Sequence, residues 1–313
     1  MKVLKSYSQG IKRATSEGKL VWLLWLANVF FASFIYFSFS GFLGRVLSRS
    51  AAAENFLKNF DMNTFFELLA HNGREIDTLI SFATLLLFGY IFVSVFLNGG
   101  ILFILIHPKK NKGKRRFAPL FFQGVGKFFG RFLRLLIYSL LLWLGVIIVN
   151  LILHIILTPI TKGGTNESLM FYLAIIRVVI AFFFVFLVKM IVDYTRIKIV
   201  IEDTRKVFRS LFEALGFVLR KLGSTLAIYY LFVLTSGIIF ALYWLVQNAV
   251  ETHALLSILI AFLIGQLFIL SRGWIKVGLQ AAQMDYFQSS EPKNNRIESE
   301  SSPAEGNPEG QIT

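Results

Sequence analysis

The stretch Leu20–Leu43, LVWLLWLANVFFASFIYFSFSGFL, has no charged residue in 24 positions. A helix of about 20 apolar residues crosses a hydrocarbon core about 30 Å thick, so this stretch predicts a transmembrane helix. It is much longer than the apolar region of a cleaved signal peptide. Five further apolar stretches predict spans at residues 79–106, 135–157, 169–192, 225–246 and 254–270, besides the first at 20–43.

The composition excludes an ordinary soluble protein. Of 313 residues, 56% are hydrophobic and only 16% are charged, whereas soluble domains carry about 25% charged residues. Only helices satisfy all their backbone groups within single apolar segments, so residues 1–287 predict an all-α, polytopic membrane helix bundle. Residues 288–313 are rich in Ser, Glu, Pro, Asn and Gly and predict a disordered acidic tail.

The distribution of positive charge predicts the orientation. The formal net charge is +14. The two termini and the loops on their side of the membrane carry 26 Lys and Arg residues, against five on the other side. Because basic loops stay in the cytoplasm, we expect both termini to be cytoplasmic. The chain has no Cys, which excludes disulfides, thiolate nucleophiles and Cys-type metal sites.

A weak internal repeat predicts how the six spans are organised. Gln9-Gly10, Gln123-Gly124 and Glu213-Ala214 occupy equivalent places before the first, third and fifth spans. We therefore expect three repeated hairpins, each preceded by an amphipathic helix on the cytoplasmic face, such as 117–134 and 207–221. Because no Gly or Pro interrupts residues 169–215, the fourth span is predicted to continue as one helix through this region.

Two polar side chains within the spans form the first candidate site. Arg177 lies about eight residues into the fourth span, or about 12 Å deep, and His154 lies near the outer end of the third. A charge within a membrane is costly, so Arg177 could bind an anionic group. The alternative is a structural hydrogen bond with His154 or with helix carbonyls. No Asp or Glu lies within the predicted spans to pair with Arg177 or to couple transport to protons.

A basic cluster between the second and third spans forms the second candidate site. Its predicted contacts with anionic headgroups are Lys109, Lys110, Lys112, Lys114, Arg115, Arg116, Lys127 and Arg131. A purely topogenic role fits the same residues. Nucleic-acid binding is not expected, because no nucleic-acid-binding module accompanies the run.

The remaining polar residues of the spans suggest structural roles. Asn28, Asn98, Asn150 and Gln266 are expected to form hydrogen bonds between helices. Gly99-Gly100 is expected to permit close helix packing or to break the helix at the membrane edge. The chain has no paired His spacing, no Walker A and no G-x-S-x-G motif, so neither metal, cofactor nor catalytic residues are predicted.

Several short motifs carry a resemblance to a known group. Phe96-Leu97-Asn98-Gly99-Gly100-Ile101, Phe129-Gly130-Arg131-Phe132-Leu133-Arg134-Leu135 and Asp193-Tyr194-Thr195-Arg196-Ile197 resemble segments of bacterial six-helix membrane proteins. These proteins are similar to the membrane domain attached to some glycerophosphodiester phosphodiesterases. The resemblance covers about residues 5–287 and implies a bacterial inner membrane. It implies no phosphodiesterase chemistry, because the chain lacks the catalytic domain.

The sequence therefore favours a non-enzymatic integral membrane protein in the bacterial inner membrane. Its leading function is that of an accessory or scaffold protein, which engages anionic lipid or a partner membrane protein, including a second copy of itself, through the basic cytoplasmic face. The alternative is a transporter or lipid-handling permease with an anionic-group site near Arg177. A membrane enzyme comes third.

Overall fold

The computed structural model describes residues 2–47, 62, 70, 72–107, 116–162, 167–250 and 255–290. Within these residues the chain forms eight α-helices and no β-strand. They are α1 (Lys2–Ser16), α2 (Gly18–Leu47), α5 (Gly73–Ile106), α6 (Phe117–Lys162), α7 (Glu167–Ile201), α8 (Val207–Arg220), α9 (Leu222–Ala249) and α10 (Leu255–Ser290). Six of them, all but α1 and α8, are long and apolar enough to cross a membrane, which confirms an all-α polytopic membrane protein.

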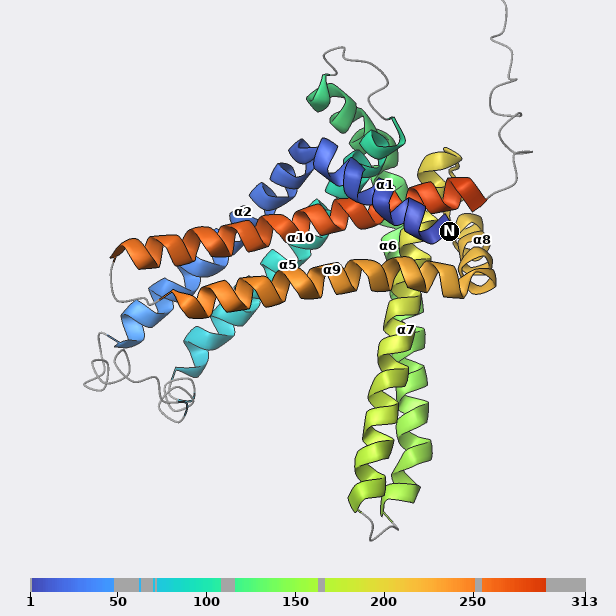
Figure 1. Cartoon of the computed structure of the whole chain (residues 1–313). Coiled ribbons are helices and arrows are strands. Elements are labelled where there is room, and N and C mark those ends of the chain that lie inside the picture. Colours follow the sequence, from blue (N-terminus) through green and yellow to red (C-terminus); the bar gives the residue numbers. More distant parts are fainter. Residues whose placement is uncertain are drawn as a thin grey trace, which may run out of the picture.

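From one end of the molecule, α2, α5, α9 and α10 extend in one direction, and the α6–α7 pair extends in another (Figure 1). Among the first four, α10 contacts both α2 and α9, and α2 also contacts α5. We call the end that these helices share the hub. It comprises α1, α8 and four segments of the long helices: residues 95–105, 121–135, 188–201 and 277–290. Most of the buried core is in the hub, including Ile101, Phe128 and Met284. The outer halves expose large apolar side chains, as lipid-facing helices do.

Small residues let the hub helices pack closely. Gly10 of α1 lies against Gly278 and Ala282 of α10: a Cβ added at Gly10 would stand 2.5 Å from the Gly278 carbonyl oxygen. Gly99 packs against the backbone of Gly124 in α6, at 3.5 Å from an added Cβ. The close approach predicted for Gly99-Gly100 is therefore confirmed, and its partner is α6.

Two of the expected amphipathic segments are separate short helices. α1 buries Ser6, Gly10 and Ala14 and exposes its basic side. α8 buries Val207 and Ala214, among others. The third segment, residues 117–134, is continuous with the following span in the single 46-residue helix α6. The internal repeat itself stays a prediction.

The expectation of one uninterrupted helix through residues 169–215 is wrong. α7 ends at Ile201 and α8 begins at Val207. Within the break, Asp203 takes a left-handed backbone conformation with φ 51°, which ends the helix. The Asp203 carboxylate forms ion pairs with Lys127 and Arg131 of α6, at 2.6 and 2.7 Å. These ion pairs hold the segment between α7 and α8 against α6.

Two helices extend well beyond the spans predicted from apolar content. α7 continues past Val192 to Ile201, and α10 continues past Leu270 to Ser290. The charged residues 189–198 and 272–276 therefore belong to the packed helices and not to loops. The predicted tail begins within this last helix, because α10 includes residues 288–290; residues 291–313 lie outside the described part.

The α1–α10 contact provides a test of this packing. We expect Gly10→Ala to lower the stability of the detergent-solubilised protein by about 1–3 kcal/mol, because the added methyl group would overlap the α10 backbone. Gly126→Ala in α6 is the matched control, because its added Cβ would meet nothing within 4 Å. Thermal unfolding followed by size-exclusion chromatography measures both. Equal melting temperatures for the two variants would contradict the close α1–α10 packing.

Candidate functional site

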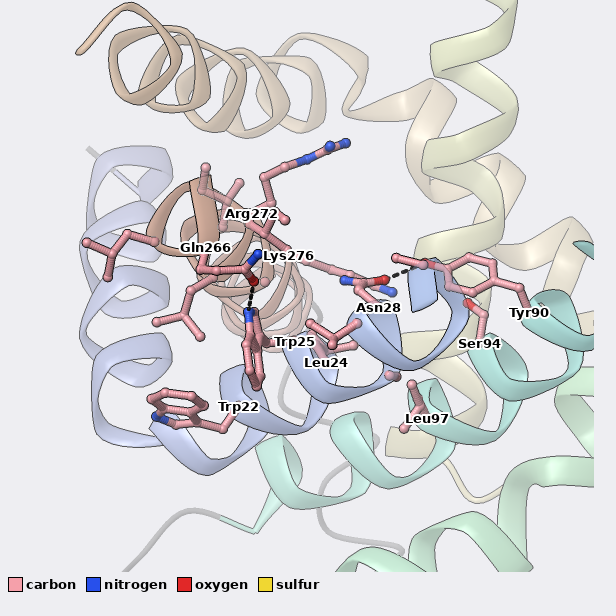
Figure 2. Close-up of a pocket in the computed structure, with 18 of the residues that line it drawn as sticks. Trp22, Leu24, Trp25, Asn28, Tyr90, Ser94, Leu97, Gln266, Arg272 and Lys276 are labelled. Carbon is pink, nitrogen blue, oxygen red and sulfur yellow. Dashed lines mark hydrogen bonds between the residues drawn. The ribbon is translucent and has the colours of Figure 1, made fainter. Parts of the chain in front are cut away.

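A cavity of about 1560 Å³ lies between α2, α5, α7, α9 and α10 (Figure 2). Small-molecule sites usually measure about 300–1000 Å³, so this cavity has room for a larger ligand. α2 and α10 form its long walls, and α5, α7 and α9 contribute fewer residues.

The lining of the cavity changes from apolar to charged along its length. On α10, Phe262, Leu263 and Leu267 line the outer end, with one polar residue, Gln266, among them. Arg272, Lys276 and Gln280 line the end toward the hub. Phe262 and Lys276 are about 21 Å apart along the helix, at about 1.5 Å per residue. α7 contributes only charged residues, Lys189, Asp193 and Arg196, all at the hub end. The cavity therefore has the polarity of an amphiphile, with one charged and one apolar end.

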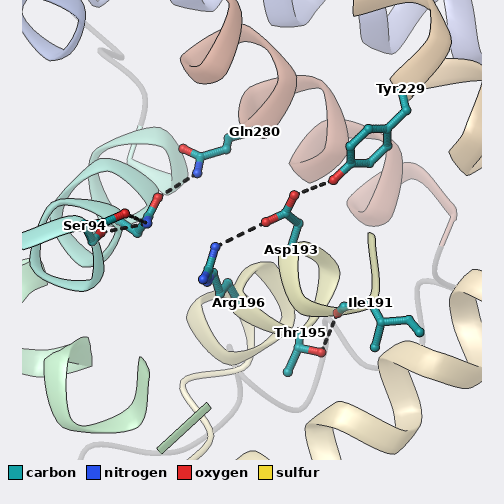
Figure 3. A network of polar contacts seen from close by, with 8 residues as sticks. Ser94, Ile191, Asp193, Thr195, Arg196, Tyr229 and Gln280 are labelled. Carbon is teal, nitrogen blue, oxygen red and sulfur yellow. Dashed lines mark hydrogen bonds and ion pairs between the residues drawn. The ribbon is translucent and has the colours of Figure 1, made fainter. Parts of the chain in front are cut away.

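Asp193 is at the centre of the charged end (Figure 3). Arg196 donates a hydrogen bond to one carboxylate oxygen at 3.2 Å, and the Tyr229 hydroxyl of α9 donates to the other. Lys276 of α10 interacts electrostatically with Asp193, Arg196 and Lys189. Since Asp193 is the only carboxylate among the lining residues, positive charge dominates this end.

Neutral amides adjoin the charged group. Gln280 donates to the Asn98 side-chain oxygen at 2.9 Å, and Asn98 donates to the Ser94 carbonyl at 2.7 Å. Both amides are buried. Within the described residues, the buried side-chain oxygen of Gln280 has no hydrogen-bond partner. The polar end therefore has buried hydrogen-bonding capacity that the protein itself does not satisfy.

Hydrogen bonds connect α2 to the helices on both sides of the cavity. Trp25 donates to Gln266 of α10 at 3.1 Å, and Tyr90 of α5 donates to Asn28 at 3.2 Å. With the Gln280–Asn98 bond, these contacts confirm the interhelical roles predicted for Asn28, Asn98 and Gln266. Asn150 differs, because its amide donates to the Val146 carbonyl of its own helix at 3.0 Å.

Arg177 and His154 lie apart from the cavity. They form a hydrogen bond of 2.9 Å with each other across the α6–α7 pair, and neither lines the cavity. The structural contact that the sequence offered as one alternative is therefore present. A role for Arg177 in binding an anionic group stays a prediction.

The predicted basic cluster is described only in part. Lys109, Lys110, Lys112, Lys114 and Arg115 lie outside the described residues, and Arg116 is exposed. Lys127 and Arg131 both contact Asp203, so each has a partner within the protein. Their role as lipid contacts stays a prediction.

Asp203 holds the α7–α8 connection against α6 through these two ion pairs. Partial burial raises the pKa of the Asp203 carboxyl, but hydrogen bonds from Lys127 and Arg131 outweigh it and lower the pKa overall. Glu213 in α8 is similar: the hydrogen bond from Arg209 lowers its pKa most, and Lys198 lowers it further at 3.1 Å. Both carboxyls therefore stabilise the hub while they are ionised.

Sequence reasoning missed the charged end of the cavity. Lys189, Asp193 and Arg196 follow one another at intervals of four and three residues, which places them on one face of a helix. Arg272 and Lys276 have the same relation in α10. This spacing was the available signal: Lys189 lies within the predicted fourth span, 169–192, and the other four residues follow the predicted spans.

Comparison of the chain with protein-family models, curated proteins and solved structures gives no match. In the part of the chain that the structure describes, no group of three His, Asp or Glu residues could hold a metal ion. The cavity itself is lined by cations, amides, aromatic and aliphatic side chains and the Asp193 carboxylate.

The Asp203 contact predicts a pH-dependent stability. Because its folded-state pKa is lowered, its contribution is present above the unfolded pKa, about 3.9, and is lost as the pH falls through the folded-state value. At pH 7 we expect Asp203→Asn to cost about 1 kcal/mol, a modest value because the side chain is 51% exposed. The difference from the native protein should shrink below about pH 4.

Thermal melts between pH 3.5 and 7 measure this difference. Asp77→Asn, at an exposed position in α5, is the matched control. A destabilisation by Asp203→Asn that is the same at every pH would contradict the ionic contact.

Proposed function

We propose that this integral membrane protein binds an anionic lipid in the cavity. The headgroup lies at the charged end, near Lys276 and Arg196, and an acyl chain lies along the apolar end, near Phe37 and Phe262. This is the lipid-handling alternative of the sequence analysis, with its anionic-group site moved from Arg177 to the α7–α10 side of the hub.

The observation that carries the proposal is the polarity gradient along the cavity. Phe262 to Leu270 of α10 extends about 12 Å, and Asn28 to Phe37 of α2 about 14 Å. Half of a hydrocarbon core about 30 Å thick is about 15 Å, the depth of one leaflet. The apolar end thus matches a chain from a single leaflet, and the cations are placed where its headgroup would be.

The distribution of positive charge supports a cytoplasmic hub. Both chain ends that the structure describes, in α1 and at the end of α10, lie at the hub (Figure 1). With the positive-inside rule, this arrangement favours a lipid from the cytoplasmic leaflet of a bacterial inner membrane.

An accessory or scaffold function is the second candidate. Outside the cavity, the hub exposes cationic side chains on α1, α6 and α8, and the α7–α8 connection exposes two more: Lys2, Lys5, Lys12, Lys127, Arg134, Arg209 and Arg220, with Arg205 and Lys206 in the connection. Such a surface attracts anionic headgroups or an acidic face of a partner protein. The two functions are compatible, because the surface and the cavity use different residues.

Lipid retention tests the binding function. We expect the purified protein to retain anionic phospholipid at about one molecule per chain. Lys276→Gln should lower the amount at least about fivefold, because a charge-assisted hydrogen bond is worth about 1.5–3 kcal/mol. Mass spectrometry of the protein in mild detergent gives the ratio.

Arg177→Gln is the matched control, because Arg177 does not line the cavity. A second cavity variant is Arg272→Gln. Because Arg272 is exposed, this substitution disturbs helix packing less than a substitution of the half-buried Lys276 does. Unchanged lipid retention in both cavity variants would contradict the proposed function. Loss of bound lipid in Arg177→Gln alone would instead indicate a lipid site at the α6–α7 pair, near Arg177.

The proposed orientation has its own test. Because the chain has no Cys, each introduced Cys is a unique label site. We expect Ser168→Cys, exposed at the outer end of α7, to react with a membrane-impermeant maleimide on intact cells. Ser8→Cys, exposed in α1, should react only after permeabilisation. The reverse pattern would contradict a cytoplasmic hub.

A further inference from the structure

We infer that the cavity selects a lipid whose headgroup ends in a terminal phosphate, a phosphomonoester, over a lipid with a phosphodiester. The inference rests on the proposed function and specifies the ligand class of the same site. It follows from the number, type and placement of the charges at the hub end of the cavity.

The charges at this end are unequal in number. Four cationic side chains line it, namely Lys189, Arg196, Arg272 and Lys276, against the single carboxylate of Asp193. Asp193 pairs with Arg196, and within the described residues no carboxylate forms a salt bridge with the other three. The protein therefore leaves an excess of three positive charges at one end of an apolar cavity.

An excess of this size suits a ligand with more than one negative charge. A phosphodiester headgroup has one ionised oxygen, whereas a terminal phosphate carries about 1.5–2 negative charges at pH 7. Lys276 is half-buried and forms no salt bridge among the described residues, so its uncompensated charge is costly. Lys189 and Arg272 are more exposed and can be partly hydrated. A dianion compensates the inner cations better than a monoanion does.

The placement of the donors leads to the same ligand. α7 supplies Lys189 and Arg196, and α10 supplies Arg272 and Lys276, so the cations come from two helices. Lys and Arg are donors only. A terminal phosphate offers three oxygens that accept strong charge-assisted hydrogen bonds, and it can therefore bridge the two helices. A phosphodiester has two such oxygens, and its second ester group occupies one direction of approach.

Asp193 is a positioning residue in this arrangement. It orients Arg196 by a hydrogen bond of 3.2 Å, and Tyr229 of α9 donates to its other oxygen. The Lys189 ammonium lies 6.0 Å from the centroid of the Tyr229 ring. The carboxylate thus fixes the inner cation and leaves the remaining cations available to the ligand.

Competition between two lipids with identical acyl chains tests the inference. The purified full chain, in neutral detergent, receives equimolar dioleoyl phosphatidic acid and dioleoyl phosphatidylglycerol, and native mass spectrometry counts each bound lipid. We expect phosphatidic acid to be favoured at least about tenfold, because one additional charge-assisted hydrogen bond is worth at least that factor. Arg272→Gln and Lys276→Gln should reduce the ratio, and Arg220→Gln, an exposed cation of α8, should not.

The outcomes separate the inference from the proposed function. Equal binding of both lipids to the native protein would overturn the preference for a terminal phosphate and leave lipid binding intact. Binding of neither lipid would overturn the proposed function itself. Displacement of phosphatidic acid by equimolar inorganic phosphate would overturn a lipid as the ligand, because the acyl chain would then contribute nothing.

Discussion

Charged side chains that pack between helices require a counter-charge, and the structure depends on how this requirement is met. At Asp203 it is met within the protein, because Lys127 and Arg131 of α6 both pair with this carboxylate. At the cavity it is met only in part: Asp193 pairs with Arg196, and the neighbouring Lys276 has no such partner among the described residues. The first arrangement stabilises the hub, and the second creates a site with affinity for anions.

The hub makes the cavity possible by concentrating helix packing at one end. Gly10, Gly99 and Gly124 bring α1, α5, α6 and α10 into close contact there. Beyond the hub, the α6–α7 pair diverges from α2, α5, α9 and α10, and the outer halves contain few of the buried core residues (Figure 1). The cavity lies where packed and diverging parts meet, and for this reason one end is charged and the other apolar.

The sequence predicted the class of the fold well and the site poorly. Apolar runs such as Leu20–Leu43 identify spans because length and composition alone decide membrane insertion. The apolar run of the fourth span ends at Val192, one residue before Asp193; the helical continuation of this span was predicted, but its charged face was not recognised as a site. The break between α7 and α8 was also missed, because it depends on Asp203 contacting α6, a contact distant in sequence. Arg177 was selected by its depth in a span, although its described partner is His154.

The most direct test of the central claim is a cryo-EM map of the protein in nanodiscs made with its native membrane lipids. Binding of an anionic lipid predicts one elongated density in the cavity, with its strongest part between Lys276 and Arg196 and a chain extending toward Phe262. A map in which the side chains of α2 and α10 close the cavity, or in which only separate water-sized peaks occupy it, would contradict this account.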